Sequence, residues 1–160
     1  MQGIPLNERK RLGALLDDRP QAEVMAMIPQ FSQAETDNFV APPAQIPEAL
    51  GVLMFNMERG VNLPEIQEFL RDCPDIQPFD VILANELDDG CARSGNKNTA
   101  RELAQAFGLN YAWGLEFIEL VNDEKAKGFH GNAVFSRWPI RRAGVIRLPE
   151  QYNWYFDRQK

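Results

Sequence analysis

Two polar residues that follow apolar runs have the chemistry of a metal site. Asn56 directly follows the run 50–55, and Glu86 comes two residues after the run 79–84. If the two runs are neighbouring parallel strands, their carboxyl ends share one edge of a sheet, where α/β proteins bind ligands. A carboxylate oxygen beside an amide oxygen suits a hard cation such as Mg²⁺. Strands also end in polar residues where they simply reach the solvent. Taken alone, Asn56 or Glu86 can therefore be explained in this way as well as by metal binding.

Three further residues are candidates for contacts to an anionic substrate. His130 and Asn132 lie at the start of an apolar run. An imidazole that is half protonated near neutral pH can donate to a phosphate, although both residues can equally serve the structure of the strand. Arg93 lies in the loop that begins at Asp88 and leads into a predicted helix, whose free N–H groups favour anions. A solvated turn is the alternative for this loop, and Asp88 is expected just behind Glu86.

The elements that would position these residues begin at residue 49, first as alternating strands and helices and then as three successive strands. Their order is strand 50–55, helix 63–70, strand 79–84, helix 99–107, and strands 110–117, 132–135 and 144–148. Pro64 suits the first turn of the first helix, Thr99 and Glu102 form a capping box for the second, and Gly108 suits its C-terminal end. Crossover connections followed by hairpins predict an α/β layered fold.

Residues 1–48 are predicted to form a helical leader and a proline-rich connector ahead of a domain that spans 49–160. Apolar residues recur at helical spacing between residues 7 and 28. Pro20 would split this stretch into two short helices, with Asn7 as the N-cap of the first. Three prolines between residues 36 and 48 predict an extended connector. We expect the leader to pack as an appendage without a chemical role.

The composition is that of a soluble globular protein. The chain has 160 residues, 44% of them apolar and 25% charged, which is enough for one domain with a core. The net charge of −6 weakly disfavours a large nucleic acid bound through its phosphates. The sequence shows no signal-peptide core and no apolar run of membrane-spanning length, which predicts a cytoplasmic protein without a membrane span. Cys73 and Cys91 are expected to be free thiols.

Three motifs, in this order, resemble those of the endonuclease/exonuclease/phosphatase superfamily. LGVLMFNMERG resembles its opening strand with an active-site Asn, and DVILANELDDG resembles its second motif, a strand that ends in a metal-binding Glu. GFHGNAVFSRWPI resembles its third motif, a Gly-x-Ala strand followed by Ser-Arg-x-Pro-Ile. The resemblance covers about residues 50–148 and leaves residues 1–48 without a counterpart.

This resemblance implies part of a four-layer α/β/β/α sandwich (DNase I-like), here with an N-terminal helical extension. It also implies hydrolysis of phosphodiester or phosphomonoester bonds by metal-activated water. Asn56 and Glu86 would be catalytic and would hold Mg²⁺, or Mn²⁺ in its place. His130, Asn132 and Arg93 would contact the substrate, a phosphate ester of a nucleic acid, a lipid or a small molecule.

The chain lacks the superfamily's later motifs. These are a strand that ends in His, a Gly-Asp-x-Asn segment and a terminal Ser-Asp-His, whereas the single histidine here is His130 in the third motif. We therefore expect a truncated chain that is inactive alone, and a catalytically inactive fragment with a structural or binding role is the alternative to an enzyme. A sheet without its partner sheet would expose one face, which predicts self-association.

Overall fold

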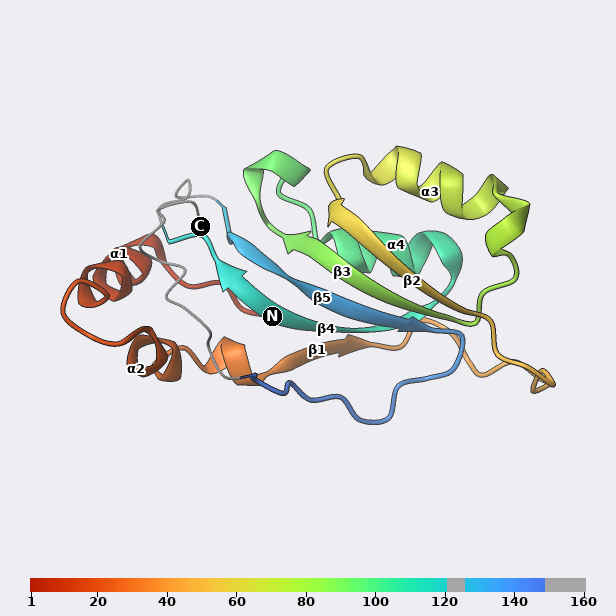
Figure 1. Cartoon of the computed structure of the whole chain (residues 1–160), viewed down its shortest axis with the longest axis horizontal. Helices are drawn as coiled ribbons and strands as arrows, with labels where there is room; N and C mark the ends of the chain where they lie inside the picture. Colours follow the sequence, from red (N-terminus) through yellow and green to blue (C-terminus); the bar gives the residue numbers. More distant parts are fainter. Residues whose placement is uncertain (121–125, 149–160) are drawn as a thin grey trace.

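The protein is an α/β structure built on a five-stranded mixed sheet (Figure 1). The computed structural model describes residues 1–120 and 126–148, so residues 121–125 and 149–160 of the predicted domain lie outside the described residues. The spatial order of the strands is β1-β4-β5-β3-β2. Their bounds are β1 Ala34–Asp37, β2 Val52–Arg59, β3 Val81–Asp89, β4 Asn110–Ile118 and β5 Phe129–Ser136. β2 and β3 pair in parallel, and the other neighbours pair antiparallel. The α/β class predicted from the sequence is confirmed.

Four α-helices and three 3-10 turns accompany the strands within the described residues. The helices are α1 Leu6–Leu15, α2 Gln21–Ala26, α3 Leu63–Asp72 and α4 Thr99–Phe107, and the turns are η1 Pro29–Ser32, η2 Pro74–Ile76 and η3 Ala92–Ser94. Pro20 separates α1 from α2, Pro64 lies in the first turn of α3, and Gly108 ends α4 with a φ of 59°, all as predicted. Across residues 1–120 and 126–148, none of these helices has the length and apolar content to cross a membrane.

Two predicted helix caps are wrong. α1 begins directly after Pro5, without a side-chain cap from Asn7. α4 is capped by Asn98, whose side chain accepts a hydrogen bond from the backbone N–H of Arg101 at 2.8 Å. Thr99 cannot form the predicted capping box, because its buried hydroxyl donates instead to the carbonyl of Asp88 at 2.8 Å. The N-terminus of α4 is thereby tied to β3.

The two faces of the sheet have different surroundings. Helices α3 and α4 cover one face (Figure 1), where Phe55 of β2 stacks on Phe69 of α3 with ring centres 5.6 Å apart. Successive side chains of a strand point to opposite faces, so Met54 and Asn56, on either side of Phe55, face away from the helices. The opposite face carries exposed apolar side chains, those of Val52, Met54, Leu83 and Val134. We call these four residues the apolar stripe.

The leader contributes a strand to this sheet. β1 was not among the predicted elements, because Ala-Glu-Thr-Asp is short and polar, yet it pairs with β4 with Ala34 opposite Gly114. Side chains of α1, α2 and the following turn are buried in the main core, among them Leu12, Val24 and Ile28. The leader is thus packed against the residues that follow it.

Residues 144–148 do not form the predicted strand. The sheet edge beside β4 is occupied by β1, which leaves no partner there for another strand. Ile146 and Leu148 are 89% and 82% exposed. Arg147 holds the segment instead, since its Nε donates to the carbonyl of Phe31 at 2.8 Å and its guanidinium lies over the Phe31 ring.

Candidate functional site

Asn56 and Glu86 lie on the two parallel strands of the sheet, as predicted. In the register of β2 and β3, Asn56 is opposite Asn85, the residue before Glu86. Their expected place just beyond the strand ends is wrong. Both lie within the strands, Asn56 where the β2–β3 register begins to shift and Glu86 where the β3–β5 register shifts.

Three non-glycine residues around this point have a left-handed backbone. Glu86 has a φ of 58°, and Glu58 and Arg59 on β2 have φ values of 46° and 66°. Such conformations cost on the order of 1 kcal/mol each and gather at functional sites, where surrounding contacts hold them in place. Bulges in neighbouring strands redirect side chains next to active sites. The strained backbone therefore marks the same position as the sequence motifs.

The backbone of Glu86 is bound by a side chain of the next strand. Its N–H donates to Oδ1 of Asn132 on β5 at 3.1 Å. The Asn132 side chain in turn donates from Nδ2 to Oε2 of Glu116 on β4 at 3.0 Å, and Asn85 lies within 3.4 Å of the same Oδ1. Among the described residues, no hydrogen bond or ion pair engages the Glu86 carboxylate, so that group is available to a ligand.

The donor set suits a hard cation that keeps most of its water. Asn56 is exposed, and its Oδ1 accepts from the N–H of Glu58 at 2.8 Å, which leaves a second lone pair on the oxygen. Within the part of the chain that the structure describes, no cluster of three or more His, Cys, Asp or Glu residues is placed to hold a metal. Mg²⁺ fits a site of one carboxylate and one amide oxygen, because it is commonly bound through one or two protein carboxylates and several waters.

His130 and Arg93, both predicted to contact substrate, converge on Asp88. The Asp88 side chain is fully buried, and it accepts from Nε and Nη2 of Arg93, each at 2.7 Å. His130 Nδ1 lies 2.9 Å from the same carboxylate, and the histidine ring stacks on Phe117. Burial acts to raise the pKa of Asp88, but hydrogen bonds from His130 and Arg93 outweigh it and hold the pKa below its ordinary value.

These contacts divide the predicted site residues into two groups. Asn132 joins Glu86, whereas His130, with a side chain only 8% exposed, joins Asp88. Arg93 is 35% exposed and also pairs with Glu119. The sequence interpretation missed Asn85 and Glu116. Asn85 precedes Glu86 directly, while Glu116 could be found only from the alternation of β4, because it carries no motif of its own.

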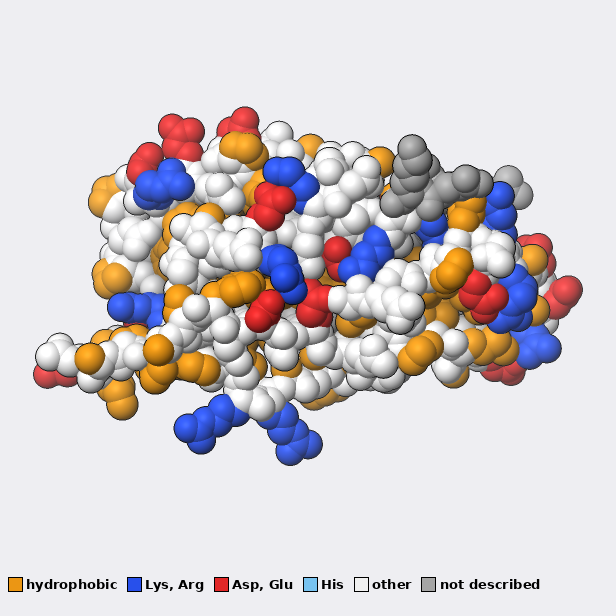
Figure 2. Space-filling view, turned by 180° about the vertical axis from the view of Figure 1, so that it is seen from behind, with side chains coloured by type: hydrophobic (Ala, Val, Ile, Leu, Met, Phe, Trp, Pro, Cys, Tyr) orange, Lys and Arg blue, Asp and Glu red, His pale blue; other side chains and the backbone are white. Residues whose placement is uncertain are grey.

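The charge distribution around the fold is mixed. On the side seen in Figure 2, acidic and basic side chains are interspersed. The net charge of the whole chain is −6. Both cysteines are free thiols, as expected, and burial raises the pKa of Cys91 far above its ordinary value.

Comparisons of the chain with protein-family models, with curated proteins and with solved structures found no match.

Proposed function

We propose that this chain carries the metal-binding part of a metal-dependent phosphoesterase site, with Glu86 as the carboxylate ligand of Mg²⁺ and Asn56 beside it. The observation that carries the proposal is the parallel pairing of β2 and β3, which brings Asn56 next to the Asn85–Glu86 bulge. The unengaged Glu86 carboxylate and the left-handed backbone around it support the same position. The substrate would be a phosphate ester.

Each residue would have a distinct role in this site. The Glu86 carboxylate would bind the cation, which when bound polarises a phosphoryl oxygen of the substrate. The exposed amide of Asn56 has its N–H₂ free to donate to a substrate oxygen, because only its Oδ1 is used within the described chain. Glu58, whose N–H holds that oxygen, fixes the amide in one orientation.

The architecture is compatible with half of a DNase I-like sandwich. Helices α3 and α4 and the five-stranded sheet would supply two of its four layers. In such a sandwich a second sheet would pack on the face that bears the apolar stripe. Exposed apolar area of this kind is typical of a surface that another layer covers.

Metal binding at Glu86 tests the proposal directly. We expect Mn²⁺, titrated into the chain and followed by electron paramagnetic resonance, to bind at one weak site with a Kd on the order of 1 mM, because one carboxylate holds such an ion loosely. Glu86→Gln should abolish this binding, whereas Glu65→Gln, on the exposed side of α3, should leave it unchanged. Equal Mn²⁺ affinity in wild type and Glu86→Gln would refute the proposal, and no binding in either would favour a purely structural or binding role.

Activity gives a second test. We expect the 160-residue chain to leave a generic phosphodiester such as bis-nitrophenyl phosphate intact in the presence of Mg²⁺, because it lacks the later motifs that activate the water. Metal-dependent turnover that Glu86→Gln abolishes would show that the 160-residue chain completes the site by itself.

A further inference from the structure

Asn132 occupies the one place where β3 and β5 fall out of register. Ala84 of β3 pairs with Ala133, and Leu87 pairs with Gly131, so Asn85 and Glu86 together face the single residue Asn132. Two residues opposite one form a bulge, in which the regular ladder of backbone hydrogen bonds is interrupted. The N–H of Glu86 donates to the Asn132 side chain in place of a ladder partner.

We infer that Asn132 is a positioning residue that holds Glu86 in its left-handed conformation and so places its carboxylate for the metal; this rests on the proposed role of Glu86. A φ of 58° at a glutamate is unfavourable unless contacts stabilise it. The hydrogen bond from the Glu86 N–H at 3.1 Å is such a contact, and it leaves the carboxylate itself unengaged. Residues that orient a metal ligand typically change metal affinity 10- to 100-fold when they are removed.

Glu116 determines which way the Asn132 amide points. Its carboxylate can only accept hydrogen bonds, so it binds the N–H₂ end of the amide, here at 3.0 Å. The carbonyl end must then face β3, where the N–H of Glu86 needs an acceptor. The reversed amide would set its oxygen against the carboxylate and its N–H₂ against the Glu86 N–H, which is unfavourable at both ends.

This polarity allows a matched rescue. In Asn132→Asp, the new carboxylate meets the Glu116 carboxylate at hydrogen-bond distance, and the repulsion between the two negative charges turns it away from both Glu116 and the N–H of Glu86. In the double variant N132D/E116Q, the amide introduced on β4 supplies the donor, and the charge of the cluster returns to that of wild type. The hydrogen bonds that link β4, β5 and Glu86 are then restored. The side chain at position 116 now donates to the side chain at position 132, which is the reverse of the wild-type direction.

The test uses two measurements on the full chain. Amide hydrogen exchange, measured by NMR in metal-free buffer, reports whether the Glu86 N–H is hydrogen-bonded. Titration with Mn²⁺ reports how well the Glu86 carboxylate binds the ion. We expect Asn132→Ala and Asn132→Asp to lose protection at Glu86 and to weaken Mn²⁺ binding about 10-fold or more. N132D/E116Q should recover both within about 3-fold, and Val134→Ala, on the same face of β5, should alter neither.

The outcomes separate this inference from the function on which it rests. Unchanged Glu86 protection in both single variants would overturn the inference whatever the metal does. Lost protection with unchanged Mn²⁺ affinity would overturn the positioning role alone. If wild type binds no Mn²⁺, or if Glu86→Gln binds it equally well, Glu86 is not a metal ligand. The role of Asn132 would then be limited to stabilising the backbone at Glu86. Should Asn132→Ala not fold, the comparison of Asn132→Asp with the double variant still decides.

Discussion

Asp88 is a fully buried carboxylate with three side-chain partners, Arg93, Ser94 and His130. Because a buried charge is stable only when it is paired and hydrogen-bonded, these partners are required for the folded state. Asp88 therefore links the loop after β3 to β5 at the same end of the sheet as Glu86. Two residues that the sequence suggested for substrate are, in the fold, partners of this carboxylate.

We expect Asp88→Asn to lower the free energy of unfolding by about 2 kcal/mol, because the new N–H₂ group would face donors on Arg93 and His130. The change in the free energy of unfolding is measured by urea denaturation in a buffer that contains a chelator, with tryptophan fluorescence as the signal. Asp75→Asn, at an exposed position in η2, should cost less than about 0.5 kcal/mol and serves as the control. A comparable loss in both variants would contradict the role of Asp88.

The same variant has a pH signature. The pKa of Asp88 is lowered in the folded chain, so its stabilising contribution is fully present above the ordinary aspartate pKa of about 4. That contribution is lost as the pH falls through the folded pKa. The stability difference between wild type and Asp88→Asn should therefore shrink as the pH falls below the ordinary aspartate pKa of about 4.

Residue roles could be predicted from the sequence only in part. A motif shows that Glu86 follows an apolar strand, and this was enough to place it beside Asn56. Asn132, which binds Glu86, and His130, which binds Asp88, come from another strand, at separations of 46 and 42 residues. The alternation of a strand does not show which side chain will fill a bulge, so these contacts required the structure.

At the element scale, the pattern of apolar runs predicted β2, β3, β4, β5, α3 and α4, and it missed the edge strand β1. The internal strands bury apolar side chains, and that burial is what a sequence pattern records. The edge strand β1 is held by polar contacts instead. Glu35 accepts from the hydroxyl of Tyr111 on β4 at 2.6 Å and from Asn98, the N-cap of α4, at 3.0 Å. The run 144–148 is apolar, but it lies against β4 at Gly114, where an added Cβ would come within 3.2 Å of a Val145 side-chain atom.

Glu35→Ala should therefore destabilise the chain by about 2 kcal/mol, because the Tyr111 hydroxyl, the Asn98 amide and the N-terminal ammonium of Met1 lose their acceptor. Thr36→Ala, at the next and exposed position of β1, should change the free energy of unfolding by less than about 0.5 kcal/mol. Urea denaturation again gives the values. If Glu35→Ala is as mild as Thr36→Ala, β1 is a loosely held appendage of the sheet and not part of its cooperative unit.

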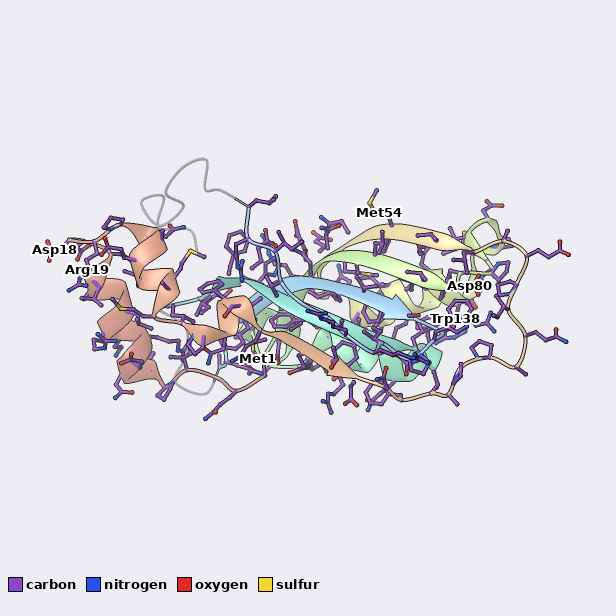
Figure 3. The ribbon with its side chains drawn as sticks, turned by 90° about the horizontal axis from the view of Figure 1, so that it is seen from below. Met1, Asp18, Arg19, Met54, Asp80 and Trp138 are labelled. Atoms are coloured by element: carbon purple, nitrogen blue, oxygen red, sulfur yellow. The ribbon has the colours of Figure 1, made fainter. Side chains whose placement is uncertain are left out.

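At the scale of the whole molecule, the helices leave one side of the sheet open. α1 and α2 pack beyond one end of the sheet (Figure 1), where their side chains meet Phe117 and Ile118 at the end of β4. The side chains of the apolar stripe on β2, β3 and β5 are exposed, with Met54 75% exposed and Val52 58% exposed. Figure 3 shows the Met54 side chain projecting outward from β2. β2 is also an edge strand, so its backbone groups and its apolar face are presented together.

We therefore predict that the 160-residue chain associates with itself through this stripe. Sedimentation velocity from micromolar to millimolar concentration should show a reversible shift from monomer to a larger species. The double variant Met54→Lys, Val134→Lys should remain a monomer, because lysine on an exposed strand opposes both apolar contact and edge pairing. Val61→Lys is the control, since Val61 is a similarly exposed apolar residue in the turn before α3, outside the stripe. A wild-type chain that stays monomeric throughout, or association that Val61→Lys abolishes equally, would contradict self-association through the stripe.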